Sequence, residues 1–252
     1  FLGFDISKEY VELAKRRIKE DLKDYMEKVK KWEAERLQKK LTDIDTVLVP
    51  IGAVEQYGPH LPLGSDFIVA LELAKRTAAK DKHSIVVPFM PFGLSYGHLD
   101  FSGTISVTAE TFSHVLIDVS RSLIHYGLRR FFCVTTHPFN IPVVLEVSRR
   151  IADEYGALMY CCNCWELTDI LLPELAETKP RGHGGEIHTS IMLAIDKNRV
   201  MMDQAPEGEL PKKMTEKITA VSTEGVKYGP AFVNMPVGMK EIVNSGCIGY
   251  PK

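Results

Sequence analysis

The sequence lacks the features that mark membrane-spanning or exported proteins. Its longest apolar runs, such as residues 85–92, are far shorter than the roughly 20 residues that are needed to cross a bilayer. The first residues mix acidic and basic side chains and show no apolar stretch before a small-residue cleavage site, so no secretory signal is recognised. We therefore expect no membrane partner and a cytoplasmic protein.

Neither sign of charge dominates the chain. It has 31 Lys and Arg against 33 Asp and Glu, which gives a formal net charge of -2. Proteins that bind nucleic acid usually carry a clear basic excess. We therefore expect no nucleic acid as a partner, and a phosphate-bearing ligand would need a local site.

Cysteine is scarce, with five residues, and three of them fall within positions 161–164. An odd number in this spacing does not resemble a disulfide framework, so we expect reduced thiols. A metal knuckle here would need a second ligand pair at finger spacing, which the sequence does not show. Because the cysteines continue the apolar run 157–160, a buried strand is the favoured interpretation.

The pattern of apolar residues indicates one layered domain after a helical beginning. The first 45 residues are charge-rich, with apolar residues at intervals of three and four, which predicts one or two amphipathic helices. From Thr46 onward, short apolar runs alternate with helical stretches, as in α/β proteins. With 252 residues and 45% hydrophobic content, the chain can bury one sizeable core.

The expected strands are residues 46–52, 84–90, 130–136 and 157–164. Helices are expected from about Asp66, over 109–126 after a Thr108 cap, and from about Asn140 with Pro142 in the first turn. Asp66 has the residue type and position of a helix N-cap. The polar stretch 206–213 is expected to be a surface loop.

Three possible metal ligands, Glu55, His60 and Asp66, lie on the segment that leaves the first expected strand. Sites of α/β proteins are usually built on such loops. A Gly-Pro turn lets Glu55 and Asp66 converge, and His137, just after another strand, would add a nitrogen ligand; this mixture suits Zn, Mn or Fe rather than Ca. The spacing also fits an alternative in which Asp66 only caps its helix, Glu55 lies on the surface and His137 is a hydrogen-bonded loop residue.

Three segments resemble those of one known family. They are Pro50-Ile-Gly-Ala-Val-Glu-Gln-Tyr-Gly-Pro-His-Leu-Pro-Leu-Gly-Ser-Asp66, Ser102-Gly-Thr-Ile-Ser106 and His183-Gly-Gly-Glu-Ile-His-Thr-Ser190. The first resembles the creatininase signature P-x-G-S-x-E-Q-H-G-P-H-L-P-x-x-x-D, and the others resemble later motifs of that family in the same order. The resemblance covers roughly residues 28–252.

The resemblance implies a fold, an activity and a set of site residues. The fold would be an α/β three-layer sandwich, with a mostly parallel sheet flanked by helices. The protein would be a metal-dependent hydrolase of a small molecule, assembled as a homo-oligomer such as a hexamer. By matching position, Glu55, Asp66 and His137 would bind metal, with Asp66 bridging two ions, and His183 would transfer a proton near the scissile group.

Two departures from the family pattern concern the second metal. Tyr57 stands where the signature has a ligand histidine, and a phenol with a pKa near 10 is a much poorer ligand than neutral imidazole. Pro138 and Phe139 replace small or ligating residues after His137, so the pocket must be shaped differently there. We therefore expect one or two divalent transition-metal ions per chain, with Tyr57 assigned to substrate binding.

The third motif also differs, because His188 replaces its glutamate. Glu186, two residues earlier, could supply the missing carboxylate as a metal ligand from the first turn of a helix; a favourable interaction with the helix dipole is the alternative. His98 and Trp165 are assigned to the substrate pocket, although an aromatic residue at a strand end is often part of the core. His60 is expected to support the site rather than to bind metal.

The two ends of the sequence need separate interpretations. Residues 1–18 resemble a piece of S-adenosylmethionine-dependent DNA methyltransferases, but no glycine-rich loop accompanies them. We expect residues 1–27 to form an N-terminal helical extension without a catalytic role. Residues 246–251 resemble a late family element that precedes a final helix in relatives, and that helix is expected to be missing.

The favoured function is hydrolysis of a cyclic amide or another non-peptide C–N bond by a metal-activated water. One alternative is ring opening of a cyclic polyol ketone, because the family also contains an inosose hydrolase. Another is a non-catalytic member whose second metal site has been lost through Tyr57 and Phe139. A methyltransferase would instead bind S-adenosylmethionine.

Overall fold

The computed structural model describes residues 41–87, 91–168, 172–178, 182–223 and 225–251. The expected N-terminal helices, including the extension 1–27 and its boundary, lie outside these residues. The chain divides into two compact units, Phe1–Asp43 and Ile44–Lys252, and the fold described below is that of the second unit.

Four parallel strands form the central sheet in the order β2-β1-β3-β4. They are β1 (Thr46–Ile51), β2 (Ser84–Val86), β3 (Arg130–Thr135) and β4 (Leu158–Asn163). β1 is buried along almost its whole length, as expected for a central parallel strand covered on both faces. The four expected strands are therefore confirmed, and β2 is shorter than predicted within the described residues.

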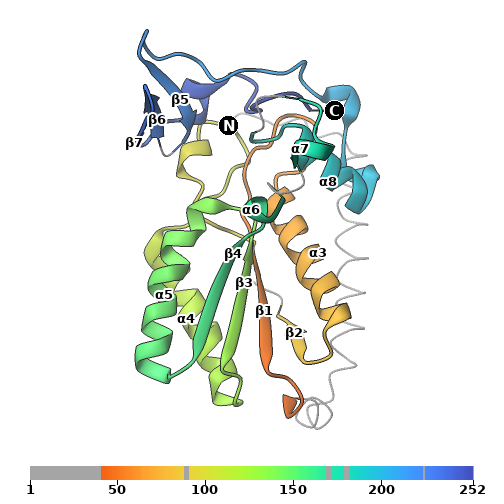
Figure 1. Cartoon of the computed structure of the whole chain (residues 1–252), viewed down its shortest axis with the longest axis vertical. Coiled ribbons are helices and arrows are strands. Elements are labelled where there is room, and N and C mark those ends of the chain that lie inside the picture. Colours follow the sequence, from red (N-terminus) through yellow and green to blue (C-terminus); the bar gives the residue numbers. More distant parts are fainter. Residues whose placement is uncertain (1–40, 88–90, 169–171, 179–181, 224, 252) are drawn as a thin grey trace, which may run out of the picture. The chain divides into compact units, whose positions relative to one another are not determined.

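Helices cover both faces of this sheet (Figure 1). α3 (Ser65–Lys80) packs against β1 on one face, with α8 (Glu186–Asp196) beside it. α4 (Ala109–His125) and α5 (Ile141–Tyr155) lie together on the other face. The predicted α/β sandwich with a mostly parallel sheet is confirmed.

The predicted caps have different outcomes. Thr108 caps α4 as expected, since its hydroxyl accepts the backbone N–H of Thr111 at 3.1 Å. Asp66 is not an N-cap: α3 starts at Ser65 after Gly64, which places Asp66 inside the first turn. The prediction was wrong by two residues, because Gly64 takes the cap position after a turn that is closed by Ser65 N–H to Pro62 C=O. The carboxylate of Asp66 is thereby released from capping.

A second, antiparallel sheet was not anticipated from the sequence. It has the order β5-β6-β7 and lies beyond the carboxyl ends of the parallel strands (Figure 1). Its core is shared with α9 and includes Ala220, Val226, Met239 and Ile242. The elements are β5 (Ile218–Ser222), β6 (Gly225–Tyr228), β7 (Ala231–Asn234) and α9 (Met239–Ile242).

Short helical turns complete the described chain. They are the 3-10 turns η1 (Tyr96–His98), η2 (Pro138–Asn140), η3 (Lys197–Arg199) and η4 (Met202–Gln204), and the helices α6 (Cys164–Thr168) and α7 (Leu172–Leu175). All five cysteines are free thiols, as expected. Among the described helices, none combines the length and apolar character that a bilayer crossing demands.

The order of the strands determines where a site can form. From β1 the chain crosses to β2 on one side, and β3 pairs with β1 on the other side. In open α/β sheets, ligands bind at such a switch point, outside the carboxyl ends of the strands. Ile51 is paired with Thr135, so the loops that carry Glu55 and His137 begin side by side.

Candidate metal centre and pocket

The loop after β1 is held in place by two neighbouring segments. Gly52 lies so close to the first turn of α3 that a Cβ there would collide with the backbone nitrogen of Phe67. The backbone of Glu55 donates to Leu63 C=O at 2.8 Å, and Gln56 N–H donates to the Thr104 hydroxyl at 3.2 Å. The family-like segment 102–106 therefore braces the loop that presents Glu55.

Glu55, Asp66 and His137 converge from three elements into one buried group. The Nδ1 atom of His137 lies 3.2 Å from Asp66 Oδ2 and 3.4 Å from Glu55 Oε1. Its Nε2 is 2.8 Å from Leu94 C=O, an arrangement in which Nε2–H donates and Nδ1 faces the carboxylates. A backbone carbonyl that orients a histidine in this way is typical of metal ligands.

Burial and mutual charge shift the pKa values of this group. Burial by itself would raise the pKa of Glu55, but His137 and His98 bring it below its usual range. Burial raises the pKa of Asp66, with a further contribution from Glu55, against the effect of His137. Burial would lower the pKa of His137, yet Glu55 and Asp66 raise it well above its ordinary value. Without a cation, a proton on His137 compensates for the two carboxylates.

The group fits a divalent cation. Both carboxylate oxygens of Asp66 are buried and have no hydrogen-bond partner among the residues that the structure describes. Buried polar atoms are rarely left without a partner, because each costs about 1–3 kcal/mol. Glu55 is only 1% exposed, so the alternative in which it is a surface residue is wrong. A cation between these oxygens and the Nδ1 of His137 would satisfy all three residues.

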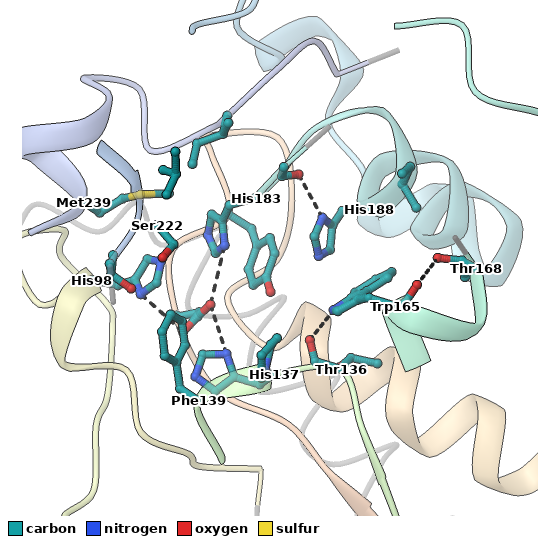
Figure 2. Close-up of a pocket in the computed structure, with 18 residues that line it drawn as sticks. His98, Thr136, His137, Phe139, Trp165, Thr168, His183, His188, Ser222 and Met239 are labelled. Carbon is teal, nitrogen blue, oxygen red and sulfur yellow. Dashed lines mark hydrogen bonds and ion pairs between the residues drawn. The ribbon is translucent and has the colours of Figure 1, made fainter. Parts of the chain in front are cut away.

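Two more histidines, His98 and His183, lie near Glu55, and Figure 2 labels both rings. His98 Nδ1 lies 3.5 Å from Glu55 Oε2, and His183 Nδ1 lies 3.6 Å from Oε1. Ser95 also donates its hydroxyl to Oε2 at 2.6 Å. Glu55 is therefore the centre of the site, with a histidine from each of three different segments around it.

Tyr57 lies inside this group as a neutral ring. It is 2% exposed and stacks on His183, with ring centroids 3.9 Å apart and planes 22° from parallel. Burial, then Asp66 and Glu55, raise the pKa of its phenol well above the ordinary value. Tyr57 cannot supply a phenolate near neutral pH, which agrees with the expectation that it is a poor metal ligand.

A cavity of about 370 Å³ opens beside the carboxylates. Phe139, Trp165 and His188 contribute to its walls, and Trp165 is fixed by its indole N–H, which donates to Thr136 C=O (Figure 2). The cavity is also lined by Tyr57, His98 and His183. The three residues assigned to substrate binding, Tyr57, His98 and Trp165, are thus all placed in the pocket wall.

Glu186 lies elsewhere, although it was predicted to bind metal. Its carboxylate accepts the backbone N–H groups of Glu177 and Thr178 and the Thr178 hydroxyl, at 2.9, 2.8 and 2.6 Å. It begins α8, as expected, but is neither a lining residue of the cavity nor part of the candidate metal groups found among the described residues. These hydrogen bonds from Glu186 hold the loop 176–178 to the start of α8.

His188 is a pocket residue whose role the sequence reasoning missed. Its Nδ1 is 3.2 Å from Gly182 C=O, and its Nε2 is buried without a hydrogen-bond partner in the described part of the chain. Burial, then His183, lower the pKa of His188 to about 3, so the ring is neutral at pH 7. His60 instead meets Thr189 at 2.9 Å, beside the site rather than in it. The sequence did offer one signal for this pocket position, because His188 stands where the family motif has a glutamate.

Comparison with known proteins agrees with this geometry. The family model for creatininase, described as creatinine amidohydrolase, matches residues 30–252. The chain belongs to the creatininase family. Its Glu55 loop and the turn before α8 both line one pocket, and the 102–106 segment contacts the Glu55 loop through Thr104.

Curated relatives within the family carry different names. The chain is 29% identical to a mycofactocin precursor peptide peptidase of Mycolicibacterium smegmatis, over 81% of this chain and 83% of the relative. It is 26% identical to a creatinine amidohydrolase of Pseudomonas putida, over 63% and 67%. It is 24% identical to a 3-dehydro-scyllo-inosose hydrolase of Thermotoga maritima, over 72% and 61%.

Solved creatininase structures have the same fold. A structure described as creatininase with Mn has a TM-score of 0.69 at 22% identity and covers 85% of this chain and 84% of its own. A mutant creatininase described as Zn-Zn type also has a TM-score of 0.69 at 22% identity, with 86% and 84% covered. At this identity the likeness concerns the fold alone.

Proposed function

We propose that the protein is a metal-dependent hydrolase of C–N amide bonds. The observation that carries this proposal is the buried group Glu55, Asp66 and His137, in which both oxygens of Asp66 lack a hydrogen-bond partner among the described residues, although His137 Nδ1 lies 3.2 Å from Oδ2. Relatives of this chain named as an amidohydrolase and a peptidase both break C–N bonds. The alternative of a non-catalytic family member predicts metal binding without turnover.

The residues divide into those that hold a cation and those that hold a substrate. Glu55, Asp66 and His137 would bind one Zn, Mn or Fe ion, and such an ion supplies Lewis acidity that makes water a nucleophile near pH 7. Phe139 and Trp165 keep bulk water from one side of the cavity, which strengthens electrostatic interactions inside it.

His183 was predicted to transfer a proton near the scissile group, and its position allows this. Its Nε2 meets the carbonyl of Gln56, so Nδ1 keeps a lone pair directed toward Glu55. Such a nitrogen can accept a proton or bind a cation, and the two roles exclude each other. The proposed hydrolase activity requires only the first metal group and does not depend on this choice.

A cyclic amide or another non-peptide C–N compound is the predicted substrate, and a cavity of about 370 Å³ can hold a small ring of this kind. A second cavity of about 840 Å³ shares His98, Phe139 and Thr223 with the first and extends to residues 234–238. This continuity favours a second candidate substrate, a peptide that occupies both cavities. An inosose remains the alternative outside C–N chemistry.

The test is a substrate screen with the metal-loaded protein. Cyclic amides, short peptides and inososes are each incubated with wild type, Glu55→Gln and the exposed control Asp153→Asn, and products are measured by mass spectrometry. We expect C–N cleavage by wild type and the control, and at least a 100-fold loss in Glu55→Gln because it removes a metal ligand. Turnover of inososes alone, or equal rates in all three proteins, would contradict the proposal.

We also propose that the protein forms a homo-oligomer, a hexamer by family resemblance, in the cytoplasm. Light scattering coupled to size-exclusion chromatography measures the mass of the assembly against the 28.3 kDa chain. A particle of one chain would contradict the expected assembly.

A further inference from the structure

We propose that Nε2 of His188 selects the substrate, by accepting a hydrogen bond from a neutral N–H or O–H group of that molecule. This inference rests on the proposed function, because the donor belongs to the compound that the cavity beside Glu55 receives. His188 comes from the first turn of α8 and lines this cavity (Figure 2).

The contacts of the His188 ring leave one nitrogen as an acceptor. Nδ1 lies 3.2 Å from the carbonyl oxygen of Gly182, and a carbonyl can only accept, so Nδ1 carries the proton. In a neutral imidazole the other nitrogen, Nε2, then has a lone pair and no hydrogen. Burial, then His183, lower the pKa of His188 to about 3, which agrees with a neutral ring at pH 7.

This acceptor nitrogen is buried and has no hydrogen-bond partner among the described residues. Buried polar atoms nearly always have a partner, because a hydrogen bond that is left unmade is costly. The ring is held in its orientation by the Gly182 carbonyl and by two aromatic neighbours. Trp165 packs edge-on against it at 4.2 Å between centroids, and Tyr57 lies at 4.9 Å.

The two aromatic rings that pack against His188 direct their own donors elsewhere. Trp165 donates its indole N–H to the carbonyl of Thr136. The pKa of the Tyr57 phenol is raised by burial and then by Asp66, so its hydroxyl lies close to that carboxylate. Neither ring therefore satisfies Nε2, and a molecule in the cavity can supply the missing donor.

The absence of charge on His188 limits the kind of group that it can bind. The family motif has a glutamate at this position, and a carboxylate there could balance an ammonium or a protonated amidine. A neutral imidazole offers a lone pair but no charge. Phe139, Trp165, Ile187 and Ile248 in the same cavity wall are also uncharged, and an unbalanced cation among them would be costly to bury. The group that fits is a neutral amide N–H or a hydroxyl.

The test compares five-membered rings that differ in one group. The probes are γ-butyrolactam, which has an amide N–H; cyclopentanone, in which a methylene group replaces it; and pyrrolidine, which is a cation at neutral pH. Each is titrated by NMR into the Zn²⁺-loaded full chain of wild type, His188→Phe and the control His114→Phe, an exposed histidine of α4. The His188→Phe substitution keeps an aromatic ring but removes the acceptor. Circular dichroism shows whether each variant is folded.

Wild type and the control should bind γ-butyrolactam about 10-fold more tightly than cyclopentanone or pyrrolidine, because only the lactam pairs Nε2 without adding charge. In His188→Phe the preference for the lactam over cyclopentanone should be lost. Equal affinities in wild type, no measurable binding of the lactam, or a preference that survives in His188→Phe would each overturn the inference.

Two further readouts keep the test decisive. If His188→Phe does not fold, wild type with isotope-labelled histidine is used, and the NMR signal of His188 Nε2 must move with γ-butyrolactam but not with cyclopentanone. Because binding is measured rather than turnover, the proposed function can fail separately. A protein that shows the lactam preference but cleaves no C–N bond contradicts the proposed hydrolysis and leaves recognition by His188 intact, whereas cleavage without the preference does the reverse.

Discussion

The Asp66→Asn variant should be at least as stable as wild type without metal, but less stable than wild type when metal is added. The substitution keeps the size of the side chain but removes the charge. Without metal, burial raises the pKa of Asp66, so its ionised form at pH 7 disfavours folding, and the Asn variant should be at least as stable as wild type. With metal, wild type gains binding free energy that the variant loses.

The size of the effect follows from mass action. A cation that binds only the folded state at 100 times its Kd stabilises it by about 2.7 kcal/mol. For a domain of this size, each kcal/mol raises Tm by roughly 2–4 °C, so metal should raise the Tm of wild type by about 5–10 °C. Asp66→Asn should show a rise of less than about 2 °C from the first site at the same metal concentration.

The assay is thermal unfolding at pH 7, followed by fluorescence or circular dichroism, in EDTA and in Zn²⁺ or Mn²⁺. Asp153→Asn, an exposed position on α5, is the matched control and should behave like wild type in both conditions. The reasoning fails if Asp66→Asn gains as much Tm from metal as wild type does. It also fails if the variant is less stable than wild type in EDTA by several degrees, since Asp66 would then be a structural residue.

Three further predictions concern neighbouring residues. Ser95→Ala removes the 2.6 Å hydrogen bond to Glu55 and should weaken metal binding by about 10–100-fold in isothermal titration, whereas Ser148→Ala, a serine of α5 far from the pocket, should change nothing. Asn140→Ala leaves Leu94 N–H and Gly52 C=O without the buried side chain that joins them, so the free energy of unfolding in urea should fall by about 2–4 kcal/mol; no loss would show that water replaces the amide. The pKa of His188 is lowered to about 3 in the folded protein, so this side chain takes up a proton near pH 6.5 only in the unfolded chain. The free energy of unfolding should therefore fall as the pH drops from 6.5 toward 3, by up to about 1.4 kcal/mol per pH unit more than in His188→Gln. Identical pH profiles for the two proteins would contradict this assignment.

Much of the fold could be predicted because its signals are local. Alternating strands and helices appear in the sequence as changes of period, and Thr108 caps α4 as its residue type suggests. Asp66 shows the limit of such reasoning, because this residue is suited to capping and yet lies two positions after the actual cap, Gly64. The antiparallel sheet β5–β7 had no clear local signal, although Val221 and Thr223 from this region line the pocket.

The sequence by itself determined the family and the residues at the core of the candidate site. The motif from Pro50 to Asp66 fixes two carboxylates on either side of a turn, and parallel strands place His137 beside them. Covalent spacing and strand order decide this much, since the carboxyl ends of neighbouring parallel strands share one edge.

Only the tertiary structure decided which other residues belong to the site. Glu186 and His183 are three positions apart in the sequence, yet Glu186 binds the backbone of residues 177 and 178 while His183 faces Glu55. His98 is 43 residues from Glu55 and meets it through a separate loop. The hydrogen-bond partner of each side chain depends on distant parts of the chain. For this physical reason the candidate ligand set could not be predicted from spacing in the sequence.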